Sequence, residues 1–490
     1  MVPPTRFASR PVLMTFHPTK VSIFALCALT MTGCLSVGPD YEPPALDTYQ
    51  DAWIAGESDV LAPGAVAEAD WWQAFNDAHM TRLVEDAASS NLDLMEANAN
   101  IEAARAAVNA ARASRFPMGQ LSGSVTRQKQ SSGTFGADLP FEFTAQTQYS
   151  AGADASWEAD LFGRIANSIG QAEAALGGRE AVAADVARAV TAQTATTYLT
   201  LRELDARISV NTESLARQEE VLDLTRQLRD AGEIADMDVE RQSNLVESTR
   251  AGIVALKSAR SETLAGLARL TGKTVPDFLT TYPDLESYQT DRLPPVEAFQ
   301  PIAIAAPVDL LRRRPDIRAA ERQLAAANYV VGAEMADLYP RLTLSGQAAF
   351  TANEPGNLFS DEALGYSFGP RLSWGIFNLP LTRAQIEQAE AEARAAEASF
   401  EGAVIQALTE TDAALEAYNF AVEEAALRVK ALGSAERALD LVELRYQEGA
   451  DSLLSLIDAQ RQTLSASDAE VQARHEALRR RVTVYRAFGG

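Results

Sequence analysis

The 490-residue chain has little of the material from which reactive sites are built. It contains two Cys and three His, too few for a disulfide framework or a zinc site. Basic residues are also fewer than acidic ones: the chain has 43 Lys and Arg and 67 Asp and Glu, which gives a net charge of −24. This balance argues against a protein that binds nucleic acid through its phosphates. We therefore expect the function to depend on shape rather than on a catalytic cluster.

Proline is absent from three long stretches, residues 64–116, 141–275 and 381–490. One Pro inside a helix costs about 3 kcal/mol, so these stretches can hold unusually long helices. After residue 34 there is no run of 18 consecutive apolar residues, and no transmembrane helix is expected there. If the chain crosses a membrane, it must do so as strands.

A coiled-coil seam can be read directly inside the last of these stretches. Its residues recur at alternating steps of three and four, with one polar interruption: Ile386, Ala389, Ala393, Ala396, Phe400, Ala403, Ala407, Glu410 and Ala414. The many Ala predict helices packed closely side by side. An amphipathic helix on a globular core is the alternative, but few cores need a helix of 60 residues, which would be about 90 Å long.

Four other segments alternate polar and apolar residues with period two. The clearest are 141–157 and 366–376, and weaker versions run through 120–126 and 341–350. Tyr and Trp near the ends of the apolar face are typical of a membrane barrel, although a soluble sandwich shows the same alternation. Three charged residues lie on the polar faces and are expected to face a barrel lumen, where they would favour a water-filled pore: Glu142, Asp154 and Arg371.

The two halves of the chain repeat each other. Tyr149 and Tyr366, Trp157 and Trp374, and Gly232 and Gly449 are each separated by 217 positions, and Gln242 and Gln460 by 218. This spacing indicates an internal duplication. Two strands in each half give four in the chain, whereas single-chain bacterial barrels begin at eight strands and open edges are not tolerated in lipid. Three copies would supply the strands of a closed barrel.

The N-terminus carries an export signal. Residues 1–33 contain three basic residues, no acid, and a 12-residue apolar run that begins at Val21, which is typical of a cleaved signal peptide. The run ends at Met31-Thr-Gly-Cys34, which resembles a bacterial lipobox, so Cys34 is predicted to carry a covalent lipid. An ordinary signal followed by an incidental Cys is the alternative.

Several motifs together resemble one family, the TolC-like outer-membrane efflux proteins, and within it the NodT-type lipoproteins that serve resistance-nodulation-division pumps. The motifs are Trp71-Trp-Gln-Ala-Phe-Asn76, Asn91-Leu-Asp-Leu94, Trp157-Glu-Ala-Asp-Leu-Phe-Gly-Arg164, Leu310-Leu-Arg-Arg-Arg-Pro-Asp-Ile-Arg318, Ala333-Glu-Met-Ala-Asp-Leu-Tyr-Pro340, Leu372-Ser-Trp-Gly-Ile-Phe377, Tyr446-Gln-Glu-Gly449 and Asp458-Ala-Gln-Arg461. The resemblance runs from about residue 34 to the C-terminus.

The resemblance implies a mainly α-helical protein with a membrane β-barrel part. Three chains would form a 12-stranded barrel in the outer membrane and a long α-helical barrel in the periplasm. The expected divisions are a signal peptide (1–33), a lipid-anchored linker (34–68), a first repeat (69–275), a Pro-rich equatorial connection (276–315) and a second repeat (316–490). Each repeat is expected to contain a helix, two barrel strands and two long tunnel helices.

The resemblance also assigns candidate functional residues. Gly232 and Gly449 would form the turns of the periplasmic tip, where an adaptor protein binds, although a Gly after a helix is also an ordinary C-cap. Asp458 would line the closed aperture of the tunnel. Asp451 is also a candidate for the aperture, since it would lie on the same helix face if the helix begins before it; it could instead be an N-cap. The basic run at 312–314 is interpreted as a source of structural ion pairs.

No nucleophile–base pair, phosphate loop or metal-ligand spacing is found, so we expect no enzyme, no cofactor and no metal. The predicted function is a passive duct that exports drugs or other small molecules handed over by an inner-membrane pump and a periplasmic adaptor. Type I secretion of a polypeptide is the alternative within this interpretation. A periplasmic coiled-coil scaffold without a pore, or a lipoprotein hydrolase, would be the alternatives outside it.

Overall fold

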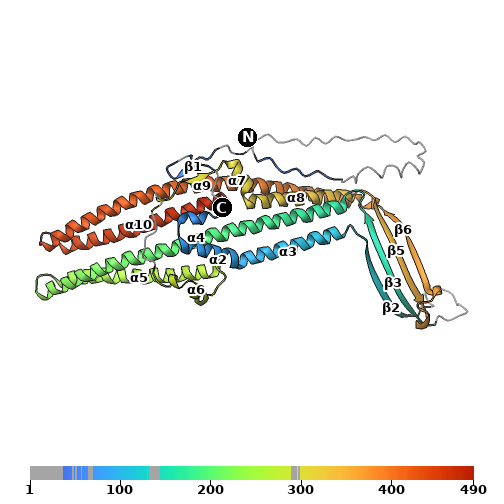
Figure 1. Ribbon diagram of the computed structural model, residues 1–490, viewed down its shortest axis with the longest axis horizontal. Coiled ribbons are helices and arrows are strands. Elements are labelled where there is room, and N and C mark those ends of the chain that lie inside the picture. The colour runs from blue at the N-terminus through green and yellow to red at the C-terminus, as the bar shows by residue number, and fades with distance from the viewer. Residues whose placement is uncertain are drawn as a thin grey trace.

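The molecule is long and narrow, with a β-sheet at one end and two helical hairpins at the other (Figure 1). The computed structural model describes residues 37–46, 49, 52–56, 58–64, 70–129, 131, 144–288, 295 and 298–489. The predicted signal peptide, Cys34 and Glu142 lie outside these residues.

The first half of the chain runs from short helices through two strands into a long hairpin. Its elements are η2 (Trp71–Phe75), α2 (Ala78–Ser90), α3 (Leu92–Ala113), β2 (Met118–Gln128), β3 (Gln146–Ala159), α4 (Arg164–Asp230), α5 (Asp236–Leu270), α6 (Val275–Thr281) and η4 (Pro283–Leu285). Side chains cap the early helices, since Asp77 and Asn91 each accept two backbone N–H bonds at the start of α2 and α3. The 67 residues of α4 make a helix of about 100 Å.

The second half repeats this order. Its elements are α7 (Pro307–Arg313), α8 (Pro315–Ala336), β5 (Arg341–Ala352), η6 (Pro355–Asn357), η7 (Asp361–Ala363), β6 (Leu364–Ser373), η8 (Ile376–Asn378), α9 (Leu379–Gln447) and α10 (Leu453–Ala487). Pro starts α7 and α8 and lies in the first turn of α9, where its missing N–H costs nothing. The fold class predicted from the sequence, mainly helical with a duplicated strand pair, is confirmed.

The seam read from the sequence lies in α9, and its burial follows the heptad. Ile386, Ala389, Phe400, Ala407 and Ala414 are buried, whereas Ala393, Ala396 and Ala403 are half-buried. The polar interruption, Glu410, is exposed. The seam therefore faces neighbouring helices of the same chain along most of its length, among them α8 and α10.

The four strands β2, β3, β5 and β6 form one antiparallel sheet in the order β2-β3-β5-β6. The register aligns residues of like character across the strands. Asp154 of β3 lies between Gln120 of β2 and Gln347 of β5, which in turn pairs with Ser367 of β6. Within the described residues, β2 and β6 each have one edge without a partner strand. The sheet of a single chain is therefore open.

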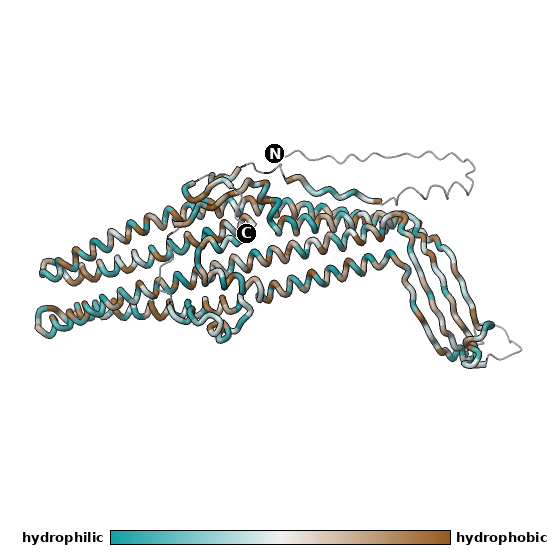
Figure 2. The backbone as a smooth tube through the Cα atoms, viewed as in Figure 1, coloured by the Kyte–Doolittle hydropathy of each residue, from teal (hydrophilic) through white to brown (hydrophobic). Residues whose placement is uncertain are grey.

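One face of this sheet is apolar and exposed. Leu121 is 88% exposed, Tyr366 74% and Phe368 83%. Leu121 and Tyr366 share a row with Ala153 and Ala348, so the apolar side chains form a continuous face. The alternation of hydrophobic and hydrophilic residues is visible along the strands (Figure 2). In water such an exposed apolar face would promote aggregation, whereas a strand that contacts lipid needs an apolar face.

Two Trp residues join the strands to the helices at equivalent places in the two halves. The indole N–H of Trp157 donates to the backbone oxygen of Arg115 at 2.9 Å, just after α3. The indole N–H of Trp374 donates to the backbone oxygen of Leu338 at 3.0 Å, just after α8. Because each bond satisfies a carbonyl beyond a helix end, each fixes the direction in which the chain enters the sheet.

The largest apolar core lies midway along the molecule, beside a small parallel sheet of β1 (Leu61–Pro63) and β4 (Ile302–Ile304). Trp71 stacks on Tyr485 with ring centroids 5.3 Å apart, and both are buried. The start of the described chain runs along the outside of α8 and α9 to reach this core (Figure 1). No helix in the described ranges combines the length and the apolar character that crossing a membrane requires.

Candidate functional site

The tip of the molecule consists of two turns, residues 231–235 and 448–452, where the long hairpins reverse. In the first turn Gly232 has φ +80° and follows the last residue of α4 and its cap. The N–H of Gly232 donates to the oxygen of Arg229, and that of Glu233 to the oxygen of Leu228, both at 2.9 Å. This pair of bonds is a Schellman motif, which needs a left-handed residue at this position.

The second turn has the same geometry. Gly449 has φ +72°, its N–H donates to the oxygen of Tyr446 at 3.0 Å, and the N–H of Ala450 donates to that of Arg445 at 2.8 Å. No atom lies within 4 Å of where a Cβ would be on either Gly, so backbone conformation rather than crowding selects glycine. The C-cap interpretation of the two Gly residues is therefore correct, and their contact with an adaptor stays a prediction.

Asp451 does not share a helix face with Asp458, because α10 begins only at Leu453. The N-cap is Ser452, whose hydroxyl accepts from the N–H of Ser455 at 3.2 Å. Asp451 instead accepts from the N–H of Ser452 at 2.9 Å and pairs with Arg445 at 3.3 Å. Hydrogen bonds from Ser455 and Ser452, together with Arg445, hold the pKa of Asp451 below its usual range.

Asp458 lies in the second turn of α10 with its carboxylate exposed. Within the part of the chain that the structure describes, it forms no ion pair. Its neighbours Leu456 and Ile457 are buried, so Asp458 is held on the surface of a helix whose opposite side is fixed in a core. An exposed carboxylate on a rigid helix is suited to line an opening.

A small apolar cluster holds the two hairpins together near the tip. It contains Leu245 of α5, Leu439 of α9, and Leu453, Leu456 and Ile457 of α10. The cluster is separate from the large core at the middle of the molecule. The tip therefore has its own apolar cluster, which contains far fewer residues than the large core at the middle of the molecule.

Acidic side chains outnumber basic ones around this cluster. Arg229 is paired with Asp230 at 2.8 Å and with Asp236 at 3.5 Å, and Arg241 with Asp238 at 3.5 Å. On α9, burial and the neighbouring Asp440 raise the pKa of Glu443, and Arg217 of α4 opposes this rise. The local cations are therefore largely engaged with acids of the same chain.

The residues predicted to line a barrel lumen are far from the tip. Asp154 lies in β3 and Arg371 in β6, and both are on the face opposite the exposed apolar side chains. Arg371 shares a row with Thr343 and Glu158, and Glu158 forms a bidentate ion pair with Arg164 at 2.9 and 2.7 Å. Their position toward a lumen stays a prediction, because it depends on neighbouring chains.

The basic run at 312–314 supplies a structural ion pair. Arg314 is 3% exposed, bonds to Asp316 at 2.6 Å and Glu410 at 3.3 Å, and donates to the backbone oxygen of Ala487 at 3.2 Å. Arg314 thus joins α8, α9 and the end of α10. In the described residues, no three His, Cys, Asp or Glu side chains cluster as a metal site would require.

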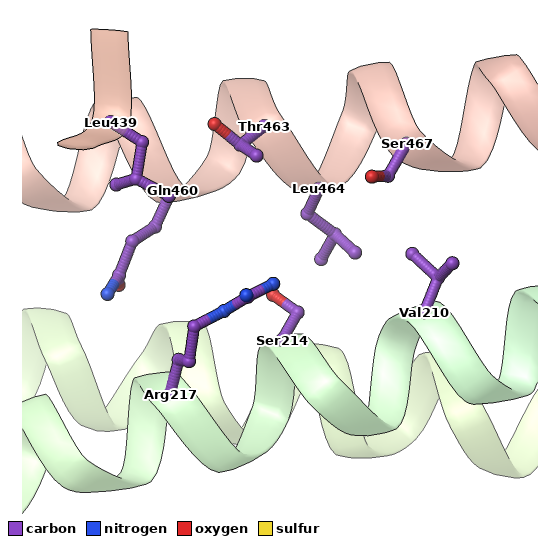
Figure 3. Close-up of a pocket in the computed structure, with 8 residues that line it drawn as sticks. All are labelled: Val210, Ser214, Arg217, Leu439, Gln460, Thr463, Leu464 and Ser467. Atoms are coloured by element: carbon purple, nitrogen blue, oxygen red, sulfur yellow. The ribbon is translucent and has the colours of Figure 1, made fainter. Parts of the chain in front are cut away.

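Sequence reasoning missed the role of a polar layer between the hairpins. Gln460 of α10 is 4% exposed, yet neither atom of its amide has a hydrogen-bond partner in the described chain. Leaving a buried polar group unsatisfied costs about 1–3 kcal/mol. Gln460 lines a cavity with Ser214 and Arg217 of α4 (Figure 3). The only signal in the sequence was that Gln242 and Gln460 recur in the duplication.

Comparison with known proteins gives one consistent result. The model of a family described as outer membrane efflux protein matches residues 83–273 and 306–490. Outer membrane protein OprJ of Pseudomonas aeruginosa is 32% identical over 477 residues, covering 95% of this chain and 94% of that protein. Nodulation protein T of Rhizobium leguminosarum bv. trifolii is 32% identical over 451 residues, covering 91% of each. The solved structure of the outer-membrane channel OprN is 35% identical and gives a TM-score of 0.84, covering 93% of this chain and 99% of that chain.

We expect stability to fall on acidification because of His475 of α10. Burial, together with the positive charges of Arg479, Arg202 and Arg474, lowers its pKa to about 3, against 6.5 for a free His; a hydrogen bond with the backbone of Leu199 acts in the opposite direction. The unfolded chain therefore binds this proton first, and each pH unit below 6.5 costs the folded state about 1.4 kcal/mol until the pH nears 3. Urea unfolding at pH 7 and pH 5 should show a smaller loss for His475→Gln than for the wild type. Equal losses in the two proteins would contradict this assignment.

Proposed function

The chain belongs to the outer membrane efflux protein family, and we propose that it is the exit duct of a tripartite pump for drugs or other small molecules. The observation that carries the proposal is the joining, in one chain, of an open amphipathic sheet to two helices, α4 and α9, that are each about 100 Å long. Such a molecule has one part suited to lipid and one part long enough to bridge a wide aqueous space. Its relatives' names support export: one is a solvent efflux pump outer membrane protein of Pseudomonas putida.

The duct would be a homotrimer. An open sheet in lipid leaves backbone N–H and C=O groups without partners, each at a cost of several kcal/mol. The free edge of β6 can pair with β2 of a neighbouring copy, and three copies bring the strand number above the minimum of about eight for bacterial barrels. The exposed apolar face would then meet lipid, and the face with Asp154 and Arg371 would line the lumen.

The hairpins would form the periplasmic tunnel and present the tip to its partners. We propose that the turns at Gly232 and Gly449 contact a periplasmic adaptor, which connects the duct to an inner-membrane pump of the resistance-nodulation-division class. The pump would supply the energy, so the duct itself would need neither catalysis nor a cofactor. Opening of the tip would then be the only step that this chain controls.

A lipid on Cys34 would anchor the same end of the molecule as the sheet. The described chain starts three residues later, where the N–H of Val37 donates to the oxygen of Phe162 at 3.1 Å. The side-chain amide of Asn167 donates to the oxygen of Val37 at 3.3 Å. Gly38 crosses Gly332 so closely that a Cβ on Gly38 would lie 2.7 Å from the Cα of Gly332. These contacts hold residue 37 beside the junction of β3 and α4, within reach of a membrane surface.

The export proposal is tested by deleting the gene in a strain that has no redundant exit duct. We expect a severalfold drop in tolerance to several unrelated toxic compounds, with tolerance restored by the wild-type gene. Unchanged tolerance together with loss of one secreted polypeptide from the medium would instead favour type I secretion.

Replacing Asp458 should change conduction more than replacing Asp451. In a trimer the three Asp458 carboxylates would form a ring, and two carboxylates about 6 Å apart at an effective dielectric of 20 repel by roughly 3 kcal/mol. Such a ring attracts cations, whereas the charge of Asp451 is balanced by Arg445. Planar-bilayer recordings of Asp458→Asn should therefore lose cation dependence, with Asp451→Asn as the matched control. An identical record for Asp458→Asn and the wild type would remove Asp458 from the aperture.

Mass spectrometry of the mature N-terminus tests the anchor. We expect the wild type to begin at a diacylated or triacylated Cys34, and Cys34→Ser to lack the lipid mass. A mature wild-type protein that begins elsewhere or carries no lipid would refute the anchor without affecting the duct.

A further inference from the structure

The two hairpins differ at one buried position that the duplication makes directly comparable. In the first hairpin the side-chain amide of Gln242 on α5 donates to the backbone oxygen of Gln218 on α4 at 2.9 Å. The positions equivalent to these two residues in the second hairpin are Gln460 and Ala435. If the halves were alike, Gln460 would donate to the oxygen of Ala435.

That oxygen is already taken in the second hairpin. The hydroxyl of Thr463 donates to the backbone oxygen of Ala435 at 3.2 Å. The first hairpin has no hydroxyl to do this, because Leu245 and Val246 occupy the corresponding place. Thr463 has therefore taken over the bond within the hairpin, and the amide of Gln460 is available for another partner.

Gln460 is directed away from its own hairpin. Figure 3 shows its side chain extending from α10 toward α4, where Ser214 and Arg217 point into the same space. Together with Leu439, Thr463 and Leu464, these residues line a small cavity of about 20 Å³, which has room for about one water molecule. Gln460 and Ser214 are 4% and 7% exposed, so the polar groups at the base of the cavity are buried.

The chemistry of the lining selects a small neutral ligand. The amide of Gln460 offers two donors and one acceptor. The hydroxyl of Ser214 already accepts from the side-chain amide of Gln218 at 3.0 Å, and its O–H can still donate. An anion is disfavoured because the carboxylate of Glu443 on α9 lies near Arg217, whose positive charge opposes the rise that burial causes in the pKa of Glu443. A cation is disfavoured by the guanidinium itself. Water fits the size, the charge and the mixed donors and acceptors.

We propose that this cavity is a binding site for ordered water that bridges the amide of Gln460 to the hydroxyl of Ser214. The water joins α10 to α4 and so links the two hairpins of one chain. The site lies next to the apolar cluster of the tip, with Leu439 belonging to both. The bridging water therefore lies at the border of the apolar cluster of the tip, which is separate from the large core at the middle of the molecule.

The consequence for gating rests on the proposed function. A bond through water can break and form again as α10 shifts over α4, because bulk water replaces the lost partner at little cost. A dry interface would have to expose apolar surface to make the same movement. The water layer thus makes the tip-side end of the hairpin interface the part that separates most readily.

A density map at a resolution that shows water tests the site directly, using the full-length trimer. We expect a peak within hydrogen-bond distance of the Gln460 amide and the Ser214 hydroxyl in the wild type, and none in Gln460→Leu. Thr463→Val is the sharper variant, because it removes the hydroxyl that donates to the oxygen of Ala435. In it the Gln460 amide should turn to the oxygen of Ala435, and the peak should be lost.

Two outcomes would overturn the site: a wild-type map without the peak, or a Gln460 amide bonded directly to protein atoms. The consequence is tested separately in planar bilayers, where Gln460→Leu should lower the open probability severalfold. If the wild type conducts and Gln460→Leu has the same open probability, the gating role is refuted and the water site is unaffected. A wild type that never conducts would refute the duct instead, while the map still decides the site.

Discussion

The free edges of β2 and β6 are the constraint on which the rest of this structure depends. Inside a bilayer every backbone polar group needs a partner, and a single described sheet of four strands leaves two rows of such groups unpaired. Pairing β6 of one chain with β2 of the next removes both rows at once. The helices that leave the sheet after Trp157 and Trp374 would then follow the same symmetry, since each Trp is bonded to the segment between the preceding helix and its strand pair.

Most of this architecture could be predicted from the sequence because it rests on periodic patterns. The steps of three and four through Ile386 and Phe400 predict a buried seam, and both residues are buried. The period-two alternation around Tyr149 and Tyr366 predicts strands, and both residues lie in one sheet. Such patterns survive because burying or exposing a whole face involves many residues, so no single local preference can overrule them.

The candidate site was less predictable, because it depends on single bonds and on where a helix begins. Asp451 was expected to share a helix face with Asp458 if the helix began early enough, but the Ser452 cap starts α10 two residues after Asp451. The partners of Arg314 lie 96 and 173 positions away, which no local pattern can indicate. The unpaired amide of Gln460 could not be foreseen either, since a repeated Gln suggests a repeated bond.

The difference between the two halves at Gln460 is where the duplicated chain would gain freedom to move in the proposed duct. The two halves agree at the sheet junction, where each Trp makes the same bond, and at the two tip turns, where each Gly has the same left-handed geometry. They disagree between these places, where Thr463 replaces the bond that Gln242 makes. Six identical hairpins in a trimer would have six equivalent interfaces, and any movement would have to involve all of them equally. Because the second hairpin differs from the first in its buried polar contacts, the proposed trimer would have two kinds of hairpin interface, and α9 and α10 of each chain would be able to shift without a matching shift of α4 and α5.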